Sequence, residues 1–149
     1  MIEIKNKNII IEDCSINLSM SFETVYSILA DKMVAFSNKV NRQYFITVKS
    51  DEFYGINFYM TIHFSEATDL ISVITLEPDY EMLRDQETEL EVIVARNKLL
   101  LANRIGNESN IIEGLTTFEN EDIIVEALYN RDKQIYQVSI QKNDSLYLN

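Results

Sequence analysis

Residues 52–64 read EFYGINFYMTIHF and alternate between apolar and polar side chains over most of their length. A period of two residues places successive side chains on opposite faces of a β-strand. The apolar face comprises Ile56, Phe58, Met60, Ile62 and Phe64, and the polar face comprises Asn57, Tyr59, Thr61 and His63. The stretch therefore predicts a half-buried strand. Its polar face is either a site or the solvated side of a sheet.

The residues after this strand predict a hairpin. Residues 65–69 form a polar loop, residues 70–76 are rich in β-branched side chains, and Pro78 closes the second strand. Alternation and β-branched content predict further strands at residues 2–5, 9–12, 44–48, 111–118, 123–129 and 135–141.

Helical spacing predicts two helices. Residues 22–35 follow Ser21, a good N-cap, and residues 79–105 carry a broad apolar stripe that ends before Gly106. Together, these patterns predict one α+β domain over residues 1–149. Its antiparallel β-sheet would have about five to seven strands, with the two main helices packed on one face.

The charge balance is strongly acidic. Twenty-four acidic residues and 13 basic ones give a formal net charge of −11. Nucleic-acid phosphates and anionic membrane surfaces would be repelled, so neither is expected as a partner. A basic protein would be attracted over long range, and it is the partner that the charge favours.

The single cysteine, Cys14, cannot form an internal disulfide, and it is expected to be an ordinary strand residue rather than a reactive thiol. The N-terminus shows no secretion signal, and no stretch is long and apolar enough for a membrane span. We therefore expect a cytoplasmic protein.

The residues give little basis for catalysis. A zinc site needs several histidine, cysteine or carboxylate ligands, and a catalytic triad needs a nucleophile and an orienting acid beside its histidine. The chain has one histidine, His63, and its three glycines are too far apart for a phosphate loop. No metal or other cofactor is expected. One alternative remains, a small hydrolase or isomerase that uses His63 and carboxylates.

Acidic side chains concentrate in two runs. Residues 77–91, EPDYEMLRDQETELE, contain one arginine, and residues 119–122, ENED, contain no cation. Tyr54 and Tyr59 add aromatic anchors beside the polar groups around His63, a combination enriched in protein interfaces. The predicted partner-binding residues are Glu87, Glu89, Glu91, Glu121, Asp122, Tyr59 and His63.

Four features follow one another along most of the chain: the stretch FYGINFYMTIHF, the strand DLISVITLEP, the acidic helix, and the closing hairpin EDIIVEALYNRDKQIYQVSIQK. In this order of elements, the chain resembles small acidic bacterial immunity proteins of contact-dependent inhibition and other polymorphic toxin systems. The resemblance implies a protein without enzymatic activity. It would occlude the active site of a toxin domain, often a basic nuclease, with acidic side chains. A third interpretation is a structural protein that self-associates into a homo-oligomer through an edge strand.

Overall fold

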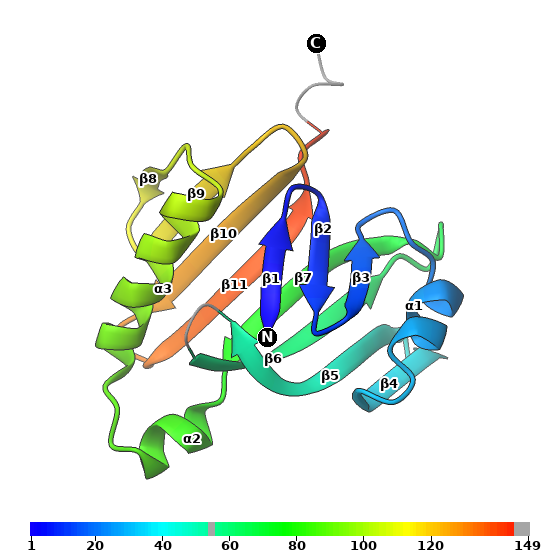
Figure 1. Ribbon diagram of the computed structural model, residues 1–149, viewed down its shortest axis with the longest axis horizontal. Helices are drawn as coiled ribbons and strands as arrows, with labels where there is room; N and C mark the ends of the chain where they lie inside the picture. Colours follow the sequence, from blue (N-terminus) through cyan, green and yellow to red (C-terminus); the bar gives the residue numbers. More distant parts are fainter. Residues whose placement is uncertain (54–55, 145–149) are drawn as a thin grey trace.

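The computed structural model describes residues 1–53 and 56–144, in which eleven strands form one sheet (Figure 1). In chain order, the elements are β1 (Ile2–Lys5), β2 (Asn8–Ile11), β3 (Cys14–Asn17), α1 (Phe22–Ile28), β4 (Met33–Val40), β5 (Gln43–Phe53), β6 (Ile56–Phe64), β7 (Ile71–Pro78), α2 (Tyr80–Asp85), α3 (Leu90–Arg104), β8 (Ser109–Ile112), β9 (Leu115–Glu119), β10 (Ile123–Asn130) and β11 (Ile135–Lys142).

The sheet is mixed rather than antiparallel. Its order is β3-β2-β1-β5-β6-β7-β11-β10-β9-β8, with β4 also paired to β5, and β1 runs parallel to β5 where Ile2 meets Phe53. Figure 1 shows β5 as a long, strongly curved strand, with α3 beside β9 at one end of the sheet. The predicted α+β class, with five to seven strands and two main helices, is therefore wrong. The described chain is mostly β, with only three short helices.

The alternation in β6 correctly predicts which side chains are buried. Phe58, Met60 and Ile62 are fully buried, whereas Tyr59 between them is 41% exposed. The hairpin with β7 also forms, and Pro78 ends its second strand. The predicted single strand over residues 52–64 is wrong in extent, because β5 ends at Phe53 and β6 begins at Ile56.

Most other strand predictions hold, but two strands, β3 and β4, were not predicted. The pairs β1–β2 and β10–β11 form close to their predicted bounds. Residues 111–118, predicted as one strand, instead belong to the short pair β8 and β9. β3 was not predicted, although the expectation that Cys14 is an ordinary strand residue agrees with its position at the start of β3.

The first helix is shorter than its helical spacing predicts. The Ser21 side chain accepts a hydrogen bond from Thr24 N at 3.3 Å and caps α1 as expected, but α1 ends at Ile28. From Met33, the chain forms β4 and pairs with β5 along its length. Pairing with a strand distant in sequence overrides the local helical spacing here, because the ladder satisfies the same backbone groups.

The predicted helix 79–105 is two helices, α2 and α3. At the end of α2, Thr88 N donates to Leu83 O at 2.9 Å, and Glu87 N donates to Arg84 O at 3.1 Å. These two bonds define a Schellman motif, and Glu87 occupies its left-handed position with φ of 53°. Glycine usually fills this position, so a glutamate there gave no sequence signal for the break.

We expect Glu87→Gly to stabilise the fold by up to about 1 kcal/mol. The left-handed conformation costs a residue with a Cβ about 1–2 kcal/mol in stability, which glycine avoids. Glycine also has greater backbone entropy in the unfolded chain, and this offsets part of the stability gained. Urea unfolding measures the change. Glu87→Ala, which keeps the Cβ, is the control, and equal stability of the two variants would contradict the role of backbone strain.

Buried hydrophobic side chains form one core cluster that reaches from β1 to β11. Tyr136 of β11 is fully buried within it, and its hydroxyl donates to Asn97 Oδ1 of α3 at 2.5 Å. The Tyr80 hydroxyl of α2 donates to Tyr136 O at 2.8 Å and accepts from Tyr136 N at 2.9 Å. These hydrogen bonds attach both α2 and α3 to β11.

Candidate functional site

The side of the sheet that faces away from the core is here called the outer face. Hydroxyl-bearing residues directly opposite one another form a row across it: Thr47 of β5, Thr61 of β6, Thr75 of β7 and Ser139 of β11. Thr47 and Thr61 are joined by a hydrogen bond of 3.1 Å between their hydroxyls. All four side chains are partly exposed. The polar alternation of β6 is thus one strand of a wider polar surface.

His63 and Tyr59 both lie on the outer face, as predicted. His63 Nε2 lies 3.2 Å from the Thr75 hydroxyl, and partial burial lowers the His63 pKa, so the ring is neutral at pH 7. Glu66 lines the same cavity of about 510 Å³, but in the described chain no carboxylate is hydrogen-bonded to His63. Tyr54 lies outside the described residues. The arrangement offers hydrogen-bonding groups rather than an oriented acid–base pair.

The first acidic group extends from the end of α2 into the first turn of α3. Glu87 follows α2, Glu89 is the N-cap residue of α3 without a side-chain capping bond, and Glu91 is in the first turn. All three side chains are exposed. Arg131, in the β10–β11 turn, pairs with Glu91 at 3.6 Å. Glu91 is therefore partly neutralised, and Glu87 and Glu89 have no ion pair within the described residues.

The second acidic group lies in the β9–β10 turn. Asn120 Oδ1 accepts hydrogen bonds from Asp122 N at 2.8 Å and from Ile123 N at 3.0 Å, which leaves the side chains of Glu121 and Asp122 pointing to solvent. Lys7 and Lys142 line the same cavity of about 590 Å³ as these two acids. Although this run has no cation near it in the sequence, the fold brings two lysines beside it.

The two acidic groups do not form one surface. Glu91 contacts the turn at one end of the β10–β11 hairpin, and Asp122 lies at the other end, where Asn143 N donates to Asp122 O at 3.0 Å. An eight-residue strand spans roughly 25 Å. Other glutamates that the sequence analysis did not select, among them Glu77 and Glu126, lie on the outer face between these ends.

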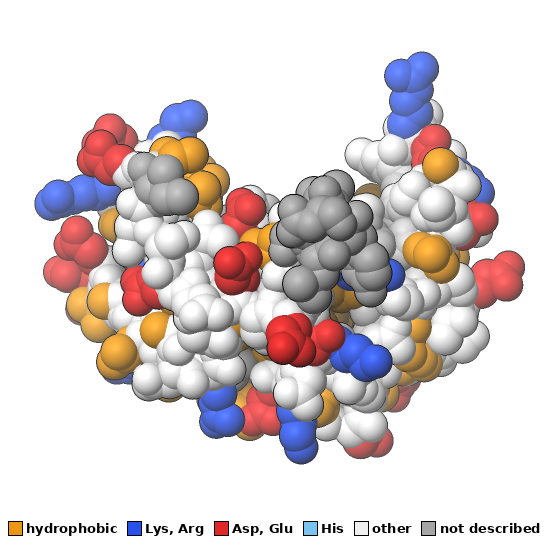
Figure 2. Space-filling model, turned by 90° about the horizontal axis from the view of Figure 1, so that it is seen from above, with side chains coloured by type: hydrophobic (Ala, Val, Ile, Leu, Met, Phe, Trp, Pro, Cys, Tyr) orange, Lys and Arg blue, Asp and Glu red, His pale blue; other side chains and the backbone are white. Residues whose placement is uncertain are grey.

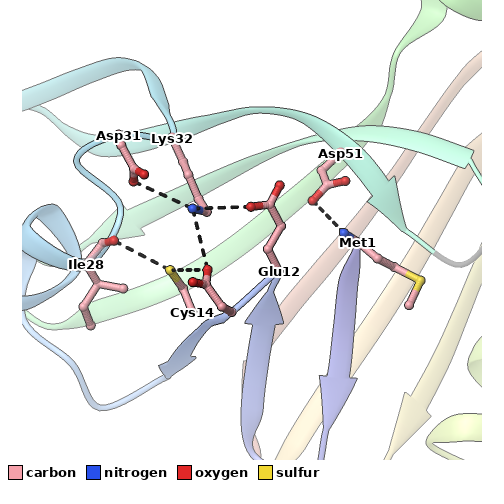
Figure 3. Close-up of polar contacts among 8 residues, drawn as sticks. Met1, Glu12, Cys14, Ile28, Asp31, Lys32 and Asp51 are labelled. Carbon is pink, nitrogen blue, oxygen red and sulfur yellow. Dashed lines mark hydrogen bonds and ion pairs between the residues drawn. The ribbon is translucent and has the colours of Figure 1, made fainter.

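Cys14 lies in a charged cluster beside Lys32 (Figure 3). The Lys32 ammonium lies 3.5 Å from Glu12, 3.7 Å from Asp31 and 3.9 Å from Asp13. Burial raises the pKa of the Cys14 thiol, and the nearby Lys32 opposes that rise only in part. A raised pKa lowers the thiolate fraction, which argues against a nucleophilic role.

In the described part of the chain, no group of three metal-binding side chains is found. None of its helices has the length and apolar character needed to cross a membrane. No protein-family model, curated protein or solved structure matches the chain.

Proposed function

We propose that this protein has no enzymatic activity and acts as an immunity protein, which binds a basic toxin domain and blocks its active site. The observation that supports the proposal most is unbalanced acidic charge. Within the described residues, only six of the 24 acidic side chains form ion pairs: Glu12, Asp13, Asp31, Asp51, Asp69 and Glu91. The remainder are free to attract a cationic protein.

The first test is affinity capture from the cell of origin at low salt, with the full chain as bait. The expected result is one basic protein, whose binding weakens as ionic strength rises and whose activity is lost when the chain is added in excess. Capture of an acidic partner, or binding that does not depend on salt, would contradict the proposal.

We expect the triple variant Glu87→Lys, Glu89→Lys and Glu91→Lys to slow association with that partner by about tenfold, with a smaller change in dissociation. Charges at the rim of an interface act mainly on the rate of encounter. Stopped-flow kinetics at low salt measures both rates.

The control for overall charge is a second triple variant, Glu23→Lys, Glu108→Lys and Glu113→Lys. It changes the net charge by the same amount at exposed positions elsewhere. Equal slowing in both variants would mean that only the total charge matters, and the α2–α3 acids would no longer be candidates for steering the partner.

A further inference from the structure

Four glutamates lie on one diagonal of the outer face. Glu119 of β9 is opposite Ile124, two residues before Glu126 of β10. Glu126 shares a row with Ser139 and Thr75, and Thr75 is two residues before Glu77 of β7. Glu77 is opposite Tyr59, and two residues before Tyr59 lies Asn57, which is opposite Glu52 of β5. Each glutamate is therefore displaced by two residues from the next, always in the same direction.

The diagonal is long, and its four charged members are all acidic. With strands about 4.8 Å apart and about 3.3 Å per residue, it spans roughly 30 Å. In the described chain, none of the four glutamates forms an ion pair. No described lysine or arginine occupies an outer-face position of β6, β7, β9, β10 or β11. On β5, the exposed Lys49 follows Phe45 and Thr47 in the alternation and is the cation on the outer face of that strand. The His63 imidazole on the same face is neutral at pH 7 because burial lowers its pKa.

Exposed apolar side chains lie among these charges. Tyr59 is 41% exposed, Ile135 44% and Leu128 48%, and all three are on the outer face. A protein interface combines such apolar and aromatic groups with polar ones. In Figure 2, the molecule is hollowed between two arms, and acidic side chains lie at the hollow.

We infer that the outer face is the docking surface for the basic partner, which presents a cationic helix along the glutamate diagonal. The inference rests on the proposed function and assigns it a surface. Charge complementarity selects the occupant, since a helix of about 20 residues is 30 Å long and can place a lysine or arginine beside each glutamate. The acidic groups at the ends of the β10–β11 hairpin then lie at the rim.

The test uses the full chain and a synthetic helical peptide of about 20 residues with lysine at every fourth position. Fluorescence anisotropy at low salt measures affinity for the wild type, for Glu77→Gln with Glu126→Gln, and for Glu87→Gln with Glu89→Gln. Both double variants remove the same charge. We expect the first to raise Kd by about tenfold and the second by less than about twofold. Amide chemical shifts should change most at Thr61, Thr75 and Ser139.

Equal losses in the two double variants, or shifts concentrated in α3 or the β9–β10 turn, would overturn the docking surface while leaving a basic partner in place. Failure of the wild type to bind the peptide would also overturn it, and the affinity capture would then decide the proposed function separately. Circular dichroism of each variant verifies that the fold is unchanged.

Discussion

Replacing Tyr136 by alanine is expected to lower the free energy of unfolding by about 3–5 kcal/mol, the range for removing a large aromatic side chain from a core. Tyr136 is fully buried in the core. Its ring meets Phe58 edge-on at 6.3 Å, and its hydroxyl donates to Asn97. The variant leaves a cavity and removes the only hydrogen bond to Asn97 Oδ1 in the described chain.

Urea unfolding measures this loss, and Tyr59→Ala is its matched control. Tyr59 is also a strand tyrosine next to the centre of the sheet, but it is 41% exposed on the outer face. We expect that control to cost far less. If both alanine variants lost similar stability, the assignment of inner and outer faces would be wrong.

Replacing Tyr80 by phenylalanine is expected to cost about 1–3 kcal/mol, although only one oxygen atom is removed. That oxygen bonds both backbone groups of Tyr136, which lies beyond the last pair of the β7–β11 ladder, Leu76 with Val138. β7 ends there at Pro78, which has no N–H to donate. The hydroxyl thus replaces a strand partner, and without it two buried backbone groups are left unsatisfied.

Tyr26→Phe is the control for this substitution, because the Tyr26 side chain is 37% exposed and its hydroxyl makes no hydrogen bond in the described structure. Its effect should stay within about 0.5 kcal/mol. Hydrogen exchange at the Tyr136 amide gives a second, local measurement. Unchanged protection of that amide in Tyr80→Phe would contradict the role assigned to the hydroxyl.

Alternation along the chain predicted the strands whose two faces differ most. β6 places Phe58 and Met60 in the core and Tyr59 outside, so its pattern and its environment agree. The sequence did not predict β4, because Met33 fits helical spacing and only pairing with β5 decides between helix and strand. The break between α2 and α3 was missed because Glu87, rather than a glycine, takes the left-handed position.

The candidate site was predictable only strand by strand. The sequence indicated the polar side of β6, with Tyr59 and His63, because alternation is a local property. It could not relate Glu77 to Glu126, since that relation depends on the register of β11 between β7 and β10. A shift of one residue in either pairing would turn one of these glutamates toward the core.

The position of β11 between β7 and β10 also affects how the chain folds during synthesis. A ribosome releases β7 well before β11, the last strand of the described chain, so the edge of β7 stays unpaired while α2, α3 and β8–β10 emerge. Closing the sheet waits for this long-range contact, which makes folding slow. A nascent chain is therefore most exposed to misassociation just before β11 emerges.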